Sequence, residues 1–254
     1  MAELADAQGG EKAGRRALST GFFVSGTDTG IGKTRVGCAL IRAMRARQIP
    51  IVGMKPVASG AYSTSNGLRN EDAEALIAAC GYSGDYTDIN PHVFAEPIAP
   101  HLAVLESSMS ISTARIRAAH SRLAMGNRLV LVEGVGGWLA PLGDSLMQSD
   151  IVRALDLQVI LVVGMRLGCI NHALLTSRAI EADGCRLIGW IANRIDPDML
   201  RFEDNRRSIQ QRIQAPLLGT VEYAEDPQAS NHAGSLDTAI EILTSQARQI
   251  HQQE

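Results

Sequence analysis

Short, continuous apolar runs alternate along the chain with segments of helical period, and this alternation constrains the fold more than any single motif. The apolar runs lie at residues 21–25, 49–57, 128–133, 158–164, 187–192 and 216–221, and the helical segments begin at Gly32 and lie at 70–81, 112–126, 171–182 and 198–213. A strand without polar alternation is buried on both faces, as in a parallel sheet that carries helices on both sides. We therefore predict an α/β fold of a single domain, with a doubly wound and mostly parallel sheet.

Capping residues indicate where some of these helices begin and end. Asn70 precedes a helical segment with acidic residues in its first turn, and Gly81 follows that segment. Ser112 begins the next segment, and Gly126 follows it. The stretch 88–106 contains several prolines, so we expect an ordered loop there.

The composition argues against several classes of protein. With 24 Lys and Arg against 27 Asp and Glu, the 254-residue chain has a net charge of −3 and no basic excess for a nucleic-acid backbone. Its longest apolar stretch, 159–165, is far shorter than the roughly 20 residues that span a bilayer. The four cysteines form no C-x-x-C pair, so we expect no zinc site and free thiols in a reducing, cytoplasmic compartment.

The strongest local motif is the glycine-rich segment 26–34, GTDTGIGKT, between the first apolar run and the first helical segment. A turn there points backbone N–H groups and a helix N-terminus toward an anion, which is typical of phosphate binding. Lys33 could then reach the terminal phosphates, and the Thr34 hydroxyl could coordinate Mg²⁺. The spacing between Gly26 and Gly32 is longer than in the usual motif, so a purely structural turn is the alternative.

The same loop bears on the class of P-loop protein. Proteins of the MinD, ParA and nitrogenase iron-protein group carry a second lysine early in this loop, where this chain has Asp28. A P-loop regulatory or assembly ATPase, which binds nucleotide to switch partners, is therefore the disfavoured alternative to an enzyme.

Two acidic residues could complete a magnesium site with Thr34. Glu133 ends the run 128–133 just before the glycine-rich turn 134–137, at the carboxyl edge of the sheet, where open α/β folds bind ligands. A solvated strand end is the alternative for Glu133. Asp72 lies in the first turn of a predicted helix, where an acid is ordinarily a partner of the helix dipole, so its position leaves both interpretations open.

Lys55 lies inside the apolar run 49–57, and two interpretations are open for it. Its side chain could extend from the sheet edge to solvent, or it could neutralise charge on a transferring phosphoryl group. Ser59 offers a hydroxyl nearby. Residues 168–171 open a later helix whose free N–H groups could hold a carboxylate, whereas His172 is better interpreted as a capping or core residue than as a catalytic one.

Eight strings, in order between residues 21 and 221, together resemble the dethiobiotin synthetase family. They are GTDTGIGKT at 26–34, KPVASG at 55–60, LRNEDA at 68–73, FAEPIAPH at 94–101, LVEGVGGWLAPL at 131–142, VILVVGMRLGCINHALLT at 159–176, GWIAN at 189–193 and APLLG at 215–219. The resemblance implies a P-loop NTPase type of fold and a ligase of biotin biosynthesis that requires Mg²⁺. Such an enzyme converts 7,8-diaminononanoate, CO₂ and ATP into dethiobiotin, ADP and phosphate through a carbamate and a carbamic–phosphoric anhydride.

The resemblance also implies roles for individual residues. The catalytic residues are Thr29, Lys33 and Lys55, and the metal ligands are Thr34, Asp72 and Glu133. The nucleotide is bound by Gly30, Ile31, Gly32, Lys33, Thr34, Arg35, Asp72, Glu133, Gly134, Val135, Gly136, Asn193 and Arg194. The substrate is bound by Ser59 and by Gly168, Cys169, Ile170 and Asn171, the last four from the neighbouring subunit of a homodimer whose active site lies at the interface.

Three departures from the family pattern concern the nucleotide. Gly30 stands where some members have an acidic residue, and Arg194 follows Asn193 where an Asp is common. The region 222–229 lacks the expected aromatic and acidic pattern, so ATP is expected and another nucleoside triphosphate stays open. For the whole chain we expect a flexible leader at 1–19 and a P-loop α/β synthetase domain at 20–254, with a helical C-terminal tail.

Overall fold

A parallel six-stranded sheet forms the centre of the computed structural model, which describes residues 21–107, 109–225 and 236–251. In the order in which they lie side by side, the strands are β10 (Leu217–Val221), β9 (Leu187–Arg194), β8 (Gln158–Met165), β1 (Gly21–Gly26), β7 (Leu129–Glu133) and β2 (Ile51–Met54). Every neighbouring pair in this sheet is parallel. The predicted doubly wound parallel sheet is thus confirmed, and the predicted leader at 1–19 lies outside the described residues.

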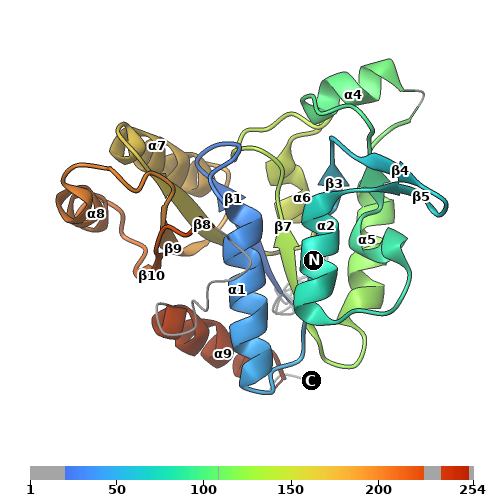
Figure 1. Cartoon of the computed structure of the whole chain (residues 1–254). Coiled ribbons are helices and arrows are strands. Elements are labelled where there is room, and N and C mark those ends of the chain that lie inside the picture. The colour runs from blue at the N-terminus through green and yellow to red at the C-terminus, as the bar shows by residue number, and fades with distance from the viewer. Residues whose placement is uncertain (1–20, 108, 226–235, 252–254) are drawn as a thin grey trace, which may run out of the picture.

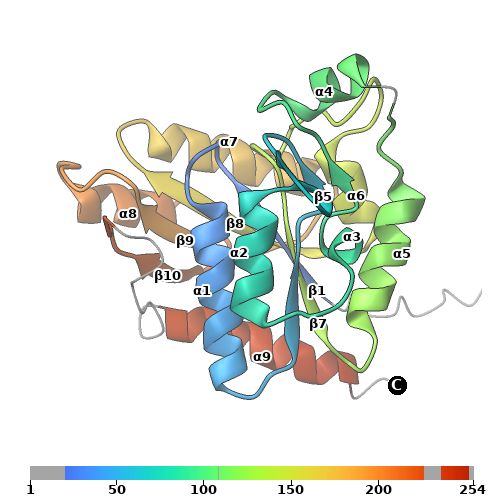
Figure 2. The same cartoon turned by 45° about the vertical axis from the view of Figure 1, so that its right-hand side comes forward.

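Helices cover both faces of this sheet, as Figures 1 and 2 show. One layer consists of α9 (Asp237–His251), α1 (Lys33–Ala46) and α2 (Glu71–Cys80). The opposite layer consists of α5 (Thr113–Ala124), α6 (Gln148–Ala154) and α7 (Cys169–Ala182), with α8 (Phe202–Gln210) packed against α7. Because the central strands are covered on both sides, all residues of β1 and β7 are buried, which explains their unbroken apolar sequence.

Smaller elements lie beyond the carboxyl end of β2. They are the parallel pair β3 (Val57–Ala58) and β6 (His92–Val93), the hairpin of β4 (Tyr62–Thr64) and β5 (Gly67–Arg69), and the short helices α3 (Tyr86–Ile89) and α4 (Pro100–Glu106). The prediction of a loop over 88–106 was therefore wrong in part. Pro100 occupies the start of α4, where its missing N–H would have no helical partner, so this proline begins a helix.

The predicted caps of α2 are confirmed, and α5 begins where the sequence placed its start. The Asn70 side chain accepts a hydrogen bond from Ala73 N–H at 3.3 Å, and Gly81 ends α2 in the left-handed conformation. The Ser112 hydroxyl accepts from Arg115 N–H at 3.2 Å at the start of α5. The helix predicted over 198–213 is shorter as α8, while the C-terminal tail forms α9 and packs against α1 and β10.

The topology determines where a ligand site can form. β1 lies between β8 and β7, so the chain runs in opposite directions across the sheet on its two sides. In an open α/β sheet, the crevice outside the carboxyl ends at this point accepts ligands. The loop between β1 and α1 lies there, above the start of α1 in Figure 1. Among the described residues, no helix is long and apolar enough to span a membrane.

Candidate active site

The glycine-rich loop between β1 and α1 is held against the carboxyl end of β8. Thr27 N–H donates to Val162 O at 3.1 Å, and Gly164 N–H donates to the Thr27 hydroxyl at 3.4 Å. Gly30 and Gly32 adopt φ of +72° and +86°, a left-handed conformation that favours glycine. A Cβ at Gly32 would also clash with the side-chain amide of Asn193. The turn therefore depends on its glycines for backbone reasons.

Lys33, the first residue of α1, has its side chain folded into this loop. The residue is buried, and its Nζ donates to Asp28 O at 2.9 Å. Burial, followed by repulsion from the ammonium of Lys55, lowers the pKa of Lys33 to about 8. An anion that entered the loop would favour the charged form, since it would supply the counter-charge that the buried ammonium lacks.

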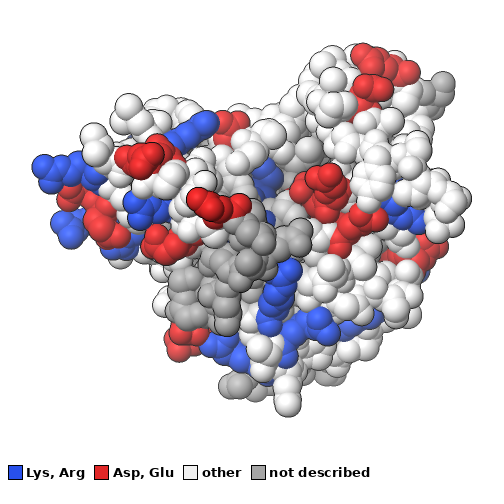
Figure 3. Space-filling view, in the orientation of Figure 1, with Lys and Arg blue, Asp and Glu red and all other residues white. Residues whose placement is uncertain are grey.

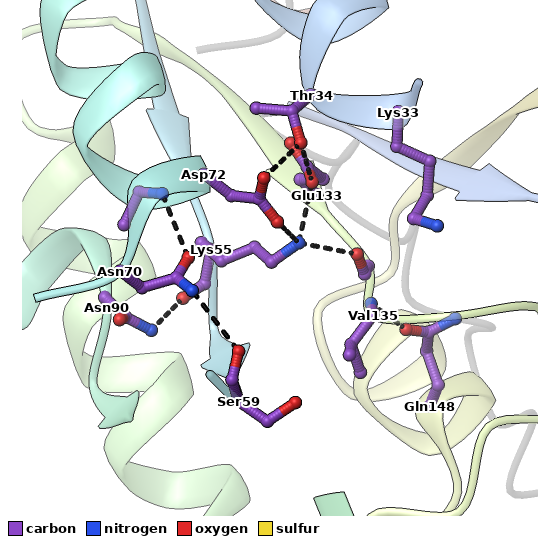
Figure 4. Close-up of polar contacts among 12 residues, drawn as sticks. Lys33, Thr34, Lys55, Ser59, Asn70, Asp72, Asn90, Glu133, Val135 and Gln148 are labelled. Atoms are coloured by element: carbon purple, nitrogen blue, oxygen red, sulfur yellow. Dashed lines mark hydrogen bonds and ion pairs between the residues drawn. The ribbon is translucent and has the colours of Figure 1, made fainter. Parts of the chain in front are cut away.

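Three oxygen-bearing side chains from distant parts of the chain meet beside the loop (Figure 4). Thr34 Oγ1 lies 2.8 Å from Asp72 Oδ1 and 2.8 Å from Glu133 Oε1. Thr34 lies in the first turn of α1, Asp72 in the first turn of α2, and Glu133 at the end of β7. The two carboxylates that the sequence left with open interpretations are therefore brought together around one hydroxyl.

Lys55 lies between the same carboxylates. Its Nζ is 2.8 Å from Asp72 Oδ2, 2.6 Å from Glu133 Oε1 and 3.2 Å from Gly134 O. With 3% of its surface exposed, Lys55 does not extend to solvent, so that interpretation was wrong. Burial lowers the pKa of Lys55, but Glu133 and Asp72 raise it more, and the net pKa lies above the ordinary value. Lys55 is thus a permanent cation in this arrangement.

The backbone of Lys55 is held by residues that the sequence did not single out for this purpose. Lys55 N–H donates to Ile89 O at 2.8 Å, and the Asn90 side chain donates to Lys55 O at 2.7 Å. Asn70, expected only as a helix cap, also donates through Nδ2 to Ser59 O at 3.4 Å. These contacts connect the segment 55–59 to α2 and α3.

The charge balance of this cluster fits a divalent cation. Burial raises the pKa of the Asp72 carboxyl, but the Lys55 ammonium outweighs that effect and the pKa lies below its ordinary value. Glu133 Oε2 is buried and has no hydrogen-bond partner in the described part of the chain. A carboxylate oxygen without a partner, next to a second carboxylate and a hydroxyl, provides the hard oxygen ligands that Mg²⁺ prefers. Thr34, Asp72 and Glu133 could therefore hold this metal.

These side chains form one wall of a pocket of about 540 Å³. The face in Figure 3 is hollowed above the start of α1, and acidic side chains gather on one rim of the hollow. The predicted site residues that line the pocket are Thr29, Gly30, Gly32, Lys33, Thr34, Arg35, Lys55, Ser59, Asp72, Glu133, Val135 and Gly136. Asn70, Glu71, Cys38 and Arg42 line it as well and were not predicted. Burial raises the pKa of the Cys38 thiol to about 12, which disfavours the thiolate form.

Other predicted site residues lie outside this pocket. The Asn193 amide donates to Ile31 O at 2.6 Å, so Asn193 supports the backbone of the loop at Ile31 from behind. The Arg194 guanidinium donates to Pro197 O at 2.8 Å and lies over the Phe202 ring, away from the pocket.

The predicted substrate segment Gly168–Asn171 also lies apart from the pocket of its own chain, at the start of α7. Gly168 caps this helix with φ +96°. His172 is half-buried and does not line the pocket either.

Solved structures with a similar fold belong to P-loop ATPases. The MinD cell division protein of Aquifex aeolicus matches with a TM-score of 0.54 at 14% identity, over 88% of this chain and 96% of that one. A ParA family ATPase from Chlorobium tepidum matches with a TM-score of 0.51 at 13% identity, over 91% and 97%. At these identities the likeness concerns the fold alone.

Sequence relatives are far closer. A family model described as an AAA domain matches residues 20–231. The ATP-dependent dethiobiotin synthetase BioD of Xanthomonas campestris pv. campestris is 52% identical over 208 residues, which cover 82% of this chain and 93% of that protein. The protein of the same name from Aromatoleum aromaticum is 50% identical over 215 residues, or 85% and 96%. This chain belongs to the family of ATP-dependent dethiobiotin synthetases.

Proposed function

We propose that this chain converts 7,8-diaminononanoate, CO₂ and ATP into dethiobiotin, ADP and phosphate. The names of its relatives support this activity. The observation that carries it is the meeting of a buried ammonium, Lys55, with the oxygens of Thr34, Asp72 and Glu133 at a phosphate-type loop. This cluster is suited to a phosphoryl transfer, because such reactions require positioning and neutralisation of charge.

The proposed reaction has three steps. A neutral amine of the substrate attacks CO₂, loses a proton and becomes a carbamate. A carbamate oxygen attacks the γ-phosphorus of ATP, the bond to the bridging oxygen breaks, and ADP leaves, which yields a carbamic–phosphoric anhydride. The second amine then attacks the carbamoyl carbon, closes the ureido ring and expels phosphate with loss of a proton. Atoms and charge balance without any redox partner.

The loop 26–34 would bind the phosphates of ATP. Its bent backbone and the start of α1 provide N–H groups directed at an anion. Lys33, buried next to this loop, would exchange its contact with Asp28 O for a phosphate oxygen. We assign Asn193 to the nucleotide base on the family membership of the chain, and its Oδ1, which has no hydrogen-bond partner in the described residues, could accept a hydrogen bond from the base.

Mg²⁺ would be held by Thr34, Asp72 and Glu133, and would supply Lewis-acid charge next to the β- and γ-phosphates. Lys55 would lie against the γ-phosphoryl oxygens and offset their charge as the carbamate approaches. Because its pKa is raised, Lys55 stays protonated and acts as a cation rather than as the base that deprotonates the amine.

The diamine would bind beside Ser59, which lines the same pocket. The chain's own residues 168–171 lie outside that pocket, so we propose that they bind the substrate carboxylate across the interface of a homodimer. Mixing a variant altered in Ser59 with one altered in Asn171 tests this arrangement. If the sites are shared, each hybrid dimer has one intact site, so an equimolar mixture should regain about a quarter of wild-type turnover, and none if each chain acts alone.

The function itself is tested by incubating the protein with 7,8-diaminononanoate, bicarbonate and MgATP. Dethiobiotin should form, and phosphate release should depend on the diamine. Phosphate release that needs no diamine, or needs only another protein, would instead indicate a regulatory ATPase. Replacing ATP with CTP, GTP or UTP in the same assay measures the nucleotide preference, which Arg194 and the region 222–229 leave open.

A further inference from the structure

The turn that follows β7 is held by a buried side chain from an element outside the pocket. Gln148, the first residue of α6, is 2% exposed. Its Oε1 accepts a hydrogen bond from Val135 N–H at 2.6 Å (Figure 4). Its Nε2 donates to Gly137 O at 2.9 Å. One amide thus satisfies a donor and an acceptor on the two sides of Gly136, which has φ +60°.

The first of these contacts is connected to Lys55 through a single peptide group. Val135 N–H and Gly134 C=O belong to the same planar peptide unit, in which the two groups point in opposite directions. Gln148 accepts from the N–H, while Lys55 Nζ donates to the C=O at 3.2 Å. Fixing the N–H therefore fixes the direction in which the carbonyl faces the ammonium.

The surrounding packing leaves Gln148 little freedom. Gln148 N–H donates to Ala140 O at 3.1 Å, which brings the start of α6 back beneath the turn. Next to it, Met147 N–H donates to Asp150 Oδ2 at 2.7 Å and closes the first turn of the helix. A Cβ at Gly134 would lie 2.6 Å from Gln148 Oε1, so this glycine is what allows the amide to approach the backbone.

We infer that Gln148 is a positioning residue for the reaction, acting through the Gly134–Val135 peptide on the ammonium of Lys55. Gln148 does not line the pocket in which the substrate and the phosphates would bind. This inference rests on the proposed function, because the role of Lys55 in phosphoryl transfer is part of that proposal. Without the amide, the peptide can rotate, and Lys55 loses the third of the contacts that hold it.

The test uses Gln148→Met, which has a similar length and no strong hydrogen-bonding group, with exposed Gln211→Met as the matched control. We expect kcat for dethiobiotin to fall about 10- to 100-fold in Gln148→Met, with little change in KM for ATP or the diamine. The Val135 amide should exchange hydrogen faster, while the rest of the sheet stays protected. A kcat equal to that of the control would overturn the inference.

Two further variants separate positioning from a general structural role. If Gln148 acts through Lys55, adding Gln148→Met to Lys55→Ala should lower kcat no further, whereas fully additive effects would refute the connection. Gln148→Glu keeps an acceptor for Val135 N–H and should retain more activity than Gln148→Met. The inference is wrong if Gln148→Glu protects the Val135 amide from hydrogen exchange and its kcat is nevertheless as low as that of Gln148→Met.

The same experiments distinguish this inference from the proposed function. If wild type and Gln211→Met make no dethiobiotin, the proposed function fails. The hydrogen exchange of Val135 then still decides whether Gln148 holds the peptide, because that measurement does not depend on the reaction.

Discussion

Replacing Lys55 with alanine should affect folding and catalysis by separable amounts. The change removes a buried cation from between Asp72 and Glu133. The side chain of Glu133 is 0% exposed and keeps only the Thr34 hydroxyl as a hydrogen-bond partner among the described residues, whereas Asp72 is 42% exposed and can turn to water. Breaking a buried pair by removing one partner costs about 3–5 kcal/mol, and Glu133 accounts for most of that cost.

The metal provides the means to separate the two effects. If Thr34, Asp72 and Glu133 bind Mg²⁺, the ion supplies the positive charge that Lys55→Ala lacks. We therefore expect that, in urea unfolding with EDTA, Lys55→Ala loses about 3–5 kcal/mol of unfolding free energy relative to wild type. Saturating Mg²⁺ should restore a good part of this stability. Turnover measured with Mg²⁺ should nevertheless remain lower by at least ~10²-fold, because the variant lacks the cation that we propose to face the γ-phosphoryl group.

The controls follow from the structure. Arg207→Ala removes an exposed cation that lies 3.9 Å from Asp204, and should change neither stability nor turnover noticeably. Wild-type turnover in Lys55→Ala would refute its catalytic role. A stability loss that is the same with EDTA and with Mg²⁺ would refute the argument that the metal and the ammonium compensate the same carboxylates.

Three further predictions concern the phosphate loop. Bound phosphate should raise the pKa of Lys33 from about 8, so nucleotide binding should take up protons near that pH and weaken as the pH rises above it. Calorimetry in buffers of different ionisation enthalpy should detect this proton uptake, and proton release on binding would contradict the prediction. Gly164→Ala places a Cβ 2.6 Å from Ile31 Cγ2 and should cost about 1–3 kcal/mol, whereas an unchanged urea midpoint would show that the loop adapts freely. The pair of Asp28 and Arg166, 2.7 Å apart and each nearly half exposed, should give a coupling of at most about 1 kcal/mol in a double-mutant cycle, and a larger value would show that solvent does not screen it.

Those parts of the site that depend on contiguous residues could be predicted from the sequence. The segment 26–34 lies between a strand and a helix, so its geometry follows from the chain itself. Glu133 could be placed because the carboxyl ends of parallel strands meet at one edge of the sheet. Asp72 and Lys55 were undecided because each meets its partner through tertiary packing: Thr34 and Asp72 are 38 positions apart, and Lys55 and Glu133 are 78.

Residues that support the site from behind gave no sequence signal. Gln148 occupies a polar stretch at a helix start, a common place for such a residue, and Asn90 lies in a stretch expected to be a loop. Each forms a hydrogen bond with a backbone group that is distant in the sequence, so the neighbouring residues do not indicate the contact. Asn90 donates to Lys55 O, and Gln148 accepts from Val135 N–H. Contacts of this kind follow from the closure of the fold rather than from periodicity.

The likeness to MinD and ParA concerns the sheet, and the chemistry is determined by what the strand ends carry. In this chain, Asp28 occupies the position at which that group has a second lysine. Its carboxylate accepts from Arg166 of the same chain and from Thr29 N–H, while its carbonyl accepts from Lys33. An acid at this position would repel a phosphate that it faced, and the ion pair with Arg166 offsets part of its charge. The position is therefore occupied by an acid that is paired within its own chain, by Arg166 and by the Thr29 N–H group.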